Sequence, residues 1–335
     1  MTRIFSRLGH VLGAAIFLFT LMAVSPVSAQ QPTKVDPNAA AVQEQQLLQE
    51  LNRIQGRVSI PDTKEGILIQ PQGRDWRHFS QVTLRWIAGI ALIGTLALLA
   101  VFYLVRGTIK IMSGRSGRTI LRFDTLERTV HWMTATSFLI LALSGLNITF
   151  GKPLLLPLIG AAAFSEISEV LKYAHNYLSF PFTIGVLFML VMWLKDNIPD
   201  RTDVEWLKEG GGMVGDKHPP ARRFNAGQKG IFWIVVLGGG AMAITGYVLM
   251  FPFYGTGIAN MQWAQILHGV IGVLFIAAIF AHIYIGTLGM EGAFDAMGSG
   301  EVDVNWAKEH HSLWVKEELP RKQSSSAHTK MTPAE

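Results

Sequence analysis

The sequence predicts an all-α integral membrane protein in which five helices cross the membrane. Half of the 335 residues are hydrophobic and only 16% are charged, a composition typical of membrane proteins. Four histidines lie within the apolar runs, where ionisable side chains usually serve a function. Runs of about 20 apolar residues, long enough to cross the hydrocarbon core, occur at Val82–Val105, Val130–Phe150, Tyr173–Leu194, Ile231–Phe251 and Ile266–Met290.

The first 29 residues have the pattern of a cleaved signal peptide. Arg3 and Arg7 precede a short apolar run at Val11–Val24, and Pro26 then leads to a small-residue site at Val27-Ser28-Ala29. Positive charge, a short apolar run and small residues in this order are typical of secretory leaders. The alternative is a sixth membrane helix, which the short run and the polar residues after it disfavour.

The segment from 30 to 81 is polar and rich in glutamine, with Ala40–Ile54 as a possible polar helix. Few apolar residues are available to build a core. Because a signal peptide would deliver it outside the cytoplasm, we expect a periplasmic linker or an arm that docks a partner.

Basic residues alternate between the connections, which gives the topology. Two connections are rich in lysine and arginine and would be cytoplasmic, whereas Gly151–Lys172 has almost none and would lie outside. Residues 82–105 would then be an extra transmembrane helix that enters the cytoplasm, and 291–335 a cytoplasmic tail, in a bacterial inner membrane. The basic residues are Arg106, Lys110, Arg115, Arg118, Arg122 and Arg128 in the first connection, and Lys195, Arg201, Lys208, Lys217, Arg222, Arg223 and Lys229 in the third. A pattern set by topology gives no case for nucleic-acid binding.

This topology places the four membrane histidines in two pairs of equal depth. His268 and His282 are about 14 residues apart on one helix, about 40° short of four full turns, so they share a face and lie roughly 21 Å apart. His131 begins the second run at its cytoplasmic end, and His175 begins the third at its outer end. Depth therefore pairs His131 with His282, and His175 with His268.

Two imidazoles that face each other from different helices are the axial ligands of a six-coordinate haem. The sequence therefore predicts two stacked b-type haems, an inner one on His131 and His282 and an outer one on His175 and His268. The absence of cysteine excludes disulfides, Fe–S ligation by this chain and covalent c-type haem attachment. The alternative is that these histidines are structural, which the two matched pairs disfavour.

Several other residues have more than one possible role. Gly145 follows His131 at the same spacing as His282 follows His268, and it could let a porphyrin approach its helix or could serve close helix packing. Packing is favoured for Gly246 and Gly272. The adjacent His310 and His311 suggest a metal site, but sequence neighbours rarely point at one ion, so a solvated or interface pair is favoured. The arginines that could pair with haem propionates are equally explained by topology, so none is assigned: Arg122, Arg128, Arg222 and Arg223.

From about Phe123 to Trp314 the chain resembles the cytochrome b (gamma) subunit of respiratory, membrane-bound formate dehydrogenase. The matching motifs are Arg128-Thr129-Val130-His131-Trp132, Leu143-Ser144-Gly145-Leu146, Asn197-Ile198-Pro199-Asp200, Phe224-Asn225-Ala226-Gly227-Gln228-Lys229, Ile266-Leu267-His268-Gly269, His282-Ile283-Tyr284, and Trp306 to Trp314 (WAKEHHSLW). The resemblance implies a four-helix transmembrane dihaem cytochrome b bundle over residues 123–290, here with one additional N-terminal transmembrane helix. The part of the chain before Lys110 departs from the family pattern.

The resemblance also implies a quinone site beside the inner haem, on Asn225, Gly227, Gln228 and His282, with menaquinone or ubiquinone as substrate. Two side-chain amides and an unshielded backbone can hydrogen-bond quinone oxygens. The alternative is an ordinary helix N-cap at Asn225.

The function implied by the resemblance is an electron-transfer anchor without formate chemistry of its own. Its partners would be a molybdenum- or tungsten-containing catalytic subunit and an Fe–S subunit, besides membrane lipid. A rival is the cytochrome b subunit of a membrane hydrogenase or related reductase. Another rival, from a different class, is a haem-free transporter or passive anchor, which would need charged residues along a path that these spans almost entirely lack.

Overall fold

The computed structural model describes residues 46, 73–213 and 218–318. The predicted signal peptide and nearly all of the predicted arm lie outside these residues. The chain divides into a unit at His10–His78, of which α3 (Gly73–His78) is described, and a second unit that contains Phe79–Glu335. The sections below concern the second unit.

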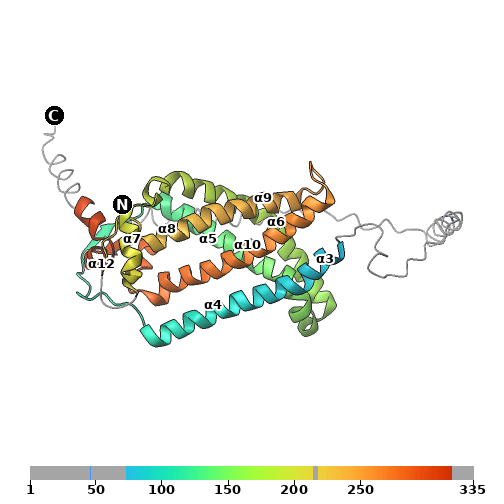
Figure 1. The fold of residues 1–335 in the computed structure, drawn as a ribbon, viewed down its shortest axis with the longest axis horizontal. Helices are drawn as coiled ribbons and strands as arrows, with labels where there is room; N and C mark the ends of the chain where they lie inside the picture. Colours follow the sequence, from blue (N-terminus) through green and yellow to red (C-terminus); the bar gives the residue numbers. More distant parts are fainter. Residues whose placement is uncertain (1–45, 47–72, 214–217, 319–335) are drawn as a thin grey trace. The chain divides into compact units, whose positions relative to one another are not determined.

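Long helices make up the second unit (Figure 1), as the sequence predicts. Within the described residues, four helical stretches are long and apolar enough to cross a membrane: Asp75–Arg106, Thr125–Trp193, Ala226–Met250 and Ile258–Gly289. The predicted all-α membrane architecture is therefore confirmed. The long helices are α4 (Leu84–Arg106), α5 (Thr125–Leu146), α6 (Leu156–Trp193), α9 (Gly239–Met250) and α10 (Ile258–Tyr284).

The stretch Thr125–Trp193 contains both the second and the third predicted span, because it doubles back on itself. α5 and α6 lie antiparallel: Ser144 of α5 contacts His175 of α6, and Thr134 of α5 lies against Gly185 further along α6. A β-carbon at position 185 would come within 2.0 Å of the Thr134 hydroxyl oxygen. Glycine therefore sets how closely these two helices approach.

The connection at Gly151–Lys172, which the sequence predicts to lie outside, is largely helical. A π-helical segment, η2 (Asn147–Leu155), continues from α5, and α6 already begins at Leu156. Three consecutive alanines at 161–163 favour helix over loop. The chain turns at Gly160, whose φ of +79° costs glycine little because it has no side chain.

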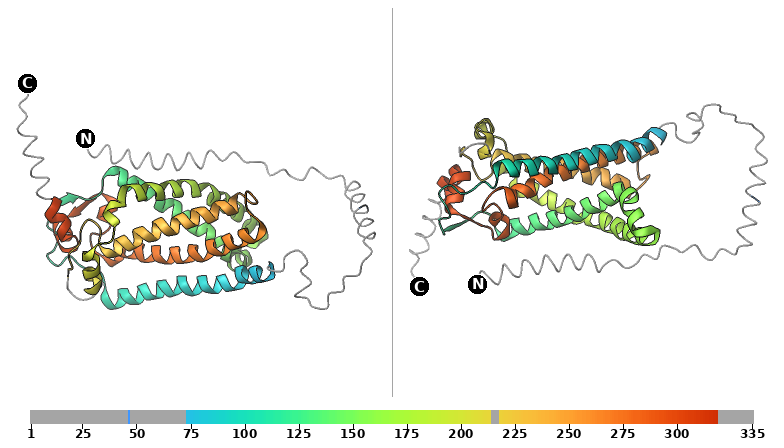
Figure 2. Two further views of the ribbon diagram at one scale, coloured as in Figure 1. Left: turned by 45° about the horizontal axis from the view of Figure 1, so that its top comes forward. Right: turned by 90° about the horizontal axis from the view of Figure 1, so that it is seen from below.

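α4 lies along α10 (Figure 2), and one stripe of side chains makes the contact. Leu84, Ala88 and Leu92 recur every four residues and are buried against Val273 and Ile276. Residues four apart lie on one face of a helix, so this stripe is the apolar contact that holds α4 to the bundle.

Among the described helices, three start with a capping box at the end of the bundle where His131 lies. We call this the inner end, as a label for its place in the fold. Each box fixes where its helix begins. Asp124 and Glu127 cap α5, Asp200 and Asp203 cap α7 (Arg201–Lys208), and Asn225 and Gln228 cap α8 (Ala226–Trp233). In each box the side chain of one residue accepts from the backbone N–H of the other, so two otherwise unpaired donors are satisfied. A π-helical segment, η5 (Ile234–Gly238), joins α8 to α9.

The segment after α10 folds back onto the connection before α5. η6 (Ile285–Gly289) ends α10, and α11 (Asp295–Gly298), β2 (Glu301–Asp303) and α12 (Val304–His310) follow. β2 pairs antiparallel with β1 (Thr119–Leu121). Asp303 joins the two segments, since its carboxylate accepts hydrogen bonds from the backbone N–H groups of Ser116, Gly117 and Asn305.

The remaining described elements are short: η1 (Phe79–Thr83), η3 (Lys195–Asn197) and η4 (Gly210–Gly212). η3 and α7 belong to the connection that the sequence predicts between the third and fourth spans. One buried cluster joins this connection to the tail and to the ends of α5 and α6. It includes Phe123, Trp193, Phe224 and Trp306.

Candidate functional site

The structure brings His131 of α5 and His282 of α10 together at the inner end of the bundle. Their ring centroids lie 6.2 Å apart, with 59° between the ring planes. The Nδ1 atom of His131 is buried and has no hydrogen-bond partner among the described residues. His131 is therefore held by its helix and by packing.

His175 of α6 and His268 of α10 form the second pair, with ring centroids 6.1 Å apart and 65° between the planes. Both imidazoles are tied through Nδ1 to a hydroxyl on a neighbouring helix. Ser144 Oγ lies 2.8 Å from His175 Nδ1, and Thr245 Oγ1 lies 2.9 Å from His268 Nδ1. The Nε2 atom of each ring is the nitrogen left for another partner.

The spacing of both pairs fits two imidazoles on one metal ion. Because a metal–nitrogen bond is about 2 Å and the nitrogen lies about 1 Å from its ring centre, the two ring centres should be roughly 6 Å apart. The two observed separations are 6.2 and 6.1 Å. No group of three or more histidine, cysteine or acidic residues with metal-binding geometry occurs in the described residues. The donor set is thus two imidazoles per site, as a haem requires.

Two glycines line the second pair. A β-carbon at Gly145 would lie 3.6 Å from His175 Cε1, and one at Gly246 would lie 3.2 Å from His268 Cε1. Gly246, for which helix packing was favoured, therefore lies at this site just as Gly145 does. Gly272 does serve packing, against Met242 of α9.

Asn225 and Gln228 act as the capping box of α8, which is the alternative that the sequence left open for the predicted quinone site. The Asn225 side-chain oxygen accepts from the Gln228 backbone N–H at 2.9 Å, and Gln228 Oε1 accepts from the Asn225 backbone N–H at 3.2 Å. Gly227 lies against Trp206, whose ring would be 3.2 Å from an added β-carbon. The box engages both side-chain oxygens and leaves the two amide NH2 groups as donors.

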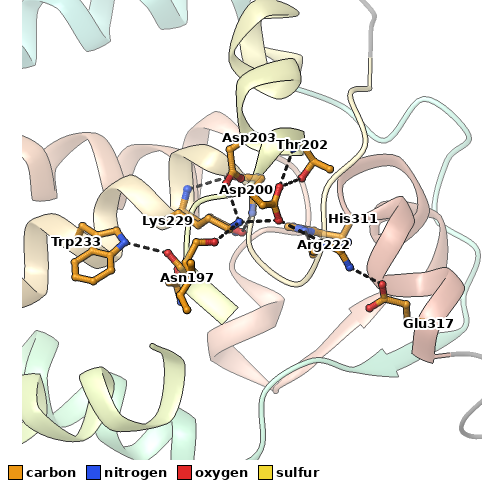
Figure 3. Close-up of polar contacts among 12 residues, drawn as sticks. Asn197, Asp200, Thr202, Asp203, Arg222, Lys229, Trp233, His311 and Glu317 are labelled. Carbon is orange, nitrogen blue, oxygen red and sulfur yellow. Dashed lines mark hydrogen bonds and ion pairs between the residues drawn. The ribbon is translucent and has the colours of Figure 1, made fainter. Parts of the chain in front are cut away.

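Lys229 is a buried cation at this end of the described structure (Figure 3). Its side chain is only 5% exposed, and Nζ lies 2.8 Å from Asp203 Oδ2 and 3.4 Å from Asp200 Oδ2. Nζ also donates to the carbonyl of Ile198 at 3.1 Å. Since Asp200 and Asp203 cap α7 and Lys229 lies on α8, this ion cluster joins the two helices.

Arg122 is a second buried cation, 3% exposed. Its guanidinium donates to the carbonyl of Arg223 and to Gln228 Oε1. The guanidinium carbon lies over three rings, 5.3 Å from that of Phe123, 5.4 Å from Trp306 and 5.1 Å from Trp314, which stabilises a cation where little solvent reaches it. Burial, and then the charge of Arg223, lower the pKa of Arg122 to about 9, so it remains charged at neutral pH.

The expectation that His310 and His311 form a solvated or interface pair is wrong. His310 is 8% exposed and His311 is fully buried, because α12 packs onto the connection before α5. His311 Nδ1 lies 2.8 Å from the carbonyl of Arg222, and the His310 ring lies 5.6 Å from that of His218. Burial lowers the pKa of His310 to about 4 and that of His311 well below its usual value.

The other three arginines considered for haem propionates also have partners within the protein. Arg222 forms ion pairs with Glu317 at 2.8 Å and with Asp200 at 3.4 Å. Arg223 forms an ion pair with Glu127 at 2.7 Å and another with Asp196 at 3.0 Å. Arg128 Nη1 donates to the carbonyl of Gly298 at 2.8 Å. All three therefore tie the inner end together.

Ser144 and Thr245 are the site residues that sequence reasoning missed. Each precedes one of the two glycines and lies near the outer end of its helix, so the repeated hydroxyl-glycine pair was the available signal. A serine or threonine in a membrane helix commonly donates a hydrogen bond to a backbone carbonyl of the same helix. A hydroxyl in these runs therefore does not by itself indicate contact with a histidine.

Comparisons with known proteins agree on the class of protein. Residues 122–300, more than half of the chain, match the family described as prokaryotic cytochrome b561. Over 205 residues the chain is 28% identical to the nitrate-inducible formate dehydrogenase cytochrome b556(Fdn) subunit of Escherichia coli (strain K12), covering 60% of this chain and 92% of the relative.

Two further relatives carry related names. The formate dehydrogenase cytochrome b556(fdo) subunit of Escherichia coli (strain K12) is 29% identical over 203 residues, 59% of this chain and 93% of the relative. The formate dehydrogenase cytochrome b556 subunit of Haemophilus influenzae is 25% identical over 214 residues, 60% of this chain and 84% of the relative. The resemblance inferred from the motifs is confirmed.

Proposed function

Because the chain belongs to the prokaryotic cytochrome b561 family, and is thus a multi-pass membrane cytochrome b that transfers electrons, we propose that it is the membrane anchor and electron-transfer subunit of a formate dehydrogenase. The relatives named above are all cytochrome b556 subunits of formate dehydrogenases. The proposed partners are a molybdenum- or tungsten-containing catalytic subunit and an Fe–S subunit. The chain itself does no formate chemistry.

The observation that carries the proposal is that four histidines form two facing pairs. His268 and His282 lie on one helix, α10, and pair with His175 and His131, with ring centres 6.1 and 6.2 Å apart. We assign His131 and His282 to the iron of an inner haem b, and His175 and His268 to that of an outer one. Haem b, when bound, supplies reversible one-electron transfer.

The protein's own contribution at these sites is position and exclusion of water. α10 fixes the separation of the two sites, roughly 21 Å along the helix axis from His268 to His282. Gly145 and Gly246 keep the backbone of α5 and α9 open beside the outer histidines. Electrons from the Fe–S subunit would enter at His175 and His268 and leave at His131 and His282.

The inner end is the proposed site of quinone reduction, on Asn225, Gly227, Gln228 and His282, with menaquinone or ubiquinone as substrate. The Asn225 and Gln228 amide NH2 groups are the donors available to a quinone oxygen, because the capping box uses both side-chain oxygens. Basic connections at this end support its placement in the cytoplasm. Quinone would then take protons from the cytoplasm, so that charge is separated across the bacterial inner membrane.

The corresponding organisation of the chain is also a proposal. It comprises a signal peptide (1–29), a periplasmic arm (30–81), an extra transmembrane helix (82–105), the dihaem core (123–290) and a cytoplasmic tail (291–335). The periplasmic arm would place the mature N-terminus on the side where the outer haem receives electrons.

Haem content per chain tests the proposal. The purified protein should hold two b haems, and His175→Ala and His282→Ala should each hold one, measured as haem per polypeptide and as the reduced-minus-oxidised spectrum. Only His282→Ala should also abolish binding of a quinone analogue. His78→Ala, which changes an exposed histidine outside the bundle, is the matched control and should keep both haems. A wild-type content well below two would refute the dihaem assignment.

A further inference from the structure

We infer that Ser144 and Thr245 are positioning residues that hold the outer histidines through Nδ1, and that they thereby lower the reduction potential of the outer haem. This inference rests on the proposed function, since it concerns the two residues behind the proposed outer ligands. It adds a difference between the two haem sites, and with it a direction for electron transfer.

The same local pattern occurs at both histidines of the outer site. Ser144-Gly145 lies on α5 next to His175 of α6, and Thr245-Gly246 lies on α9 next to His268 of α10. In both cases the hydroxyl meets Nδ1 and the glycine lies against Cε1 of the same ring. In two separate helix pairs, a hydroxyl on one helix thus holds Nδ1 of the histidine on the other.

The hydrogen atoms at each brace can be assigned from the second contact of the hydroxyl. Ser144 Oγ lies 2.7 Å from the carbonyl of Ile140, and Thr245 Oγ1 lies 2.7 Å from that of Ala241. A hydroxyl has one hydrogen, which it donates to this carbonyl, so it accepts from the imidazole. Nδ1 then carries the ring hydrogen, and Nε2 keeps the lone pair that iron ligation needs.

The inner site lacks this arrangement at His131, whose Nδ1 is buried without a hydrogen-bond partner among the described residues. A ring N–H that donates to an acceptor makes the imidazole a more basic ligand. A more basic ligand favours the oxidised iron, which lowers the reduction potential. The two hydroxyls therefore favour electron movement from the outer site toward the inner one.

Thr245→Val removes the hydroxyl at nearly constant shape, and Thr245→Ser keeps the hydroxyl while it removes the methyl group. Ser144→Ala tests the second brace. Thr134→Val is the matched control, because Thr134 is also buried and its hydroxyl donates to its own helix, at Val130. The readout is a redox titration of the b-haem absorbance of the complete protein, which does not depend on activity.

His175→Ala first identifies the outer component as the one that it removes. Thr245→Val and Ser144→Ala should each raise the potential of that component, with at least a threefold change in its reduced-to-oxidised ratio at the wild-type midpoint, about 28 mV where tenfold is 59 mV. The inner component should not move, and Thr245→Ser and Thr134→Val should match the wild type.

Three results would overturn the inference: no shift in Thr245→Val, an equal shift of both components, or a shift in Thr245→Ser as large as in Thr245→Val. If Thr245→Val loses the outer haem, retention in Thr245→Ser supports the hydroxyl brace, and loss in both refutes it. A wild-type protein without two b haems would refute the proposed function itself, so the two failures are distinguishable.

Discussion

Removal of the Lys229 charge should destabilise the inner end of the molecule. Lys229 Nζ lies 2.8 Å from Asp203 Oδ2, and the side chains of the lysine and the aspartate are only 5% and 12% exposed. Lys229→Met would leave Asp203 as a buried charge without its partner, which typically costs about 3–5 kcal/mol. We expect a loss near the lower end of this range, because Asp203 still accepts from the Asp200 backbone N–H at 2.7 Å.

A loss of about 3 kcal/mol corresponds to a fall in melting temperature of roughly 6–12 °C, at about 2–4 °C per kcal/mol for a domain of this size. Thermal unfolding in detergent, followed by circular dichroism at neutral pH, is the assay. The control is Lys208→Met, which removes an exposed lysine on the adjacent α7 and should change stability by no more than about 0.5 kcal/mol.

The double variant Lys229→Met/Asp203→Leu separates charge from packing. Because it removes both members of the pair, it should recover a large part of the stability lost in Lys229→Met alone. If Lys229→Met unfolds at the same temperature as Lys208→Met, or if the double variant is as unstable as the sum of its parts, the ion cluster does not hold α7 to α8.

Two further changes test the outer site and the folded tail. Gly246→Ala should disturb the spectrum of the proposed outer haem more than Gly145→Ala does. The added β-carbon would lie 3.2 Å from His268 Cε1 in the first variant and 3.6 Å from His175 Cε1 in the second. Equal spectra would contradict this. Burial holds the pKa of His310 at about 4 against 6.5 in the unfolded chain, so below pH 6.5 only the unfolded state gains the proton. Melting temperature should therefore fall between pH 6.5 and 4, by the equivalent of about 3 kcal/mol, and His310→Asn should flatten part of this fall; an unchanged pH profile would contradict the assignment.

The positions of the histidines could be read from the sequence because membrane helices obey strict geometric rules. The spacing between His268 and His282 puts both side chains on one face of a straight helix, and the structure brings His175 and His131 opposite them. Depth and topology restrict the possible partners further.

The errors occur where neighbouring segments decide the environment. His310 and His311 lie in a polar stretch of sequence, yet they are buried because β2 pairs with β1 and brings α12 onto the inner end. The braces at Ser144 and Thr245 depend on which helix lies beside which, which hydropathy does not contain. The helical structure of the connection at Gly151–Lys172 was likewise not predicted, although its alanines favour helix.

The pairing of β1 with β2 has a consequence for the modular construction of the chain. It joins the segment before α5 to the segment after α10, and the bridge between Ile109 and Met290 joins the same two segments. The two ends of the histidine-bearing bundle therefore meet, a geometry that tolerates circular permutation. The segment from Thr119 to Asp303 therefore begins and ends at the same strand pair. α4 lies outside this segment and packs on the bundle through its own stripe of leucine and alanine side chains. Loss of α4 would therefore leave the pairing of β1 with β2 intact.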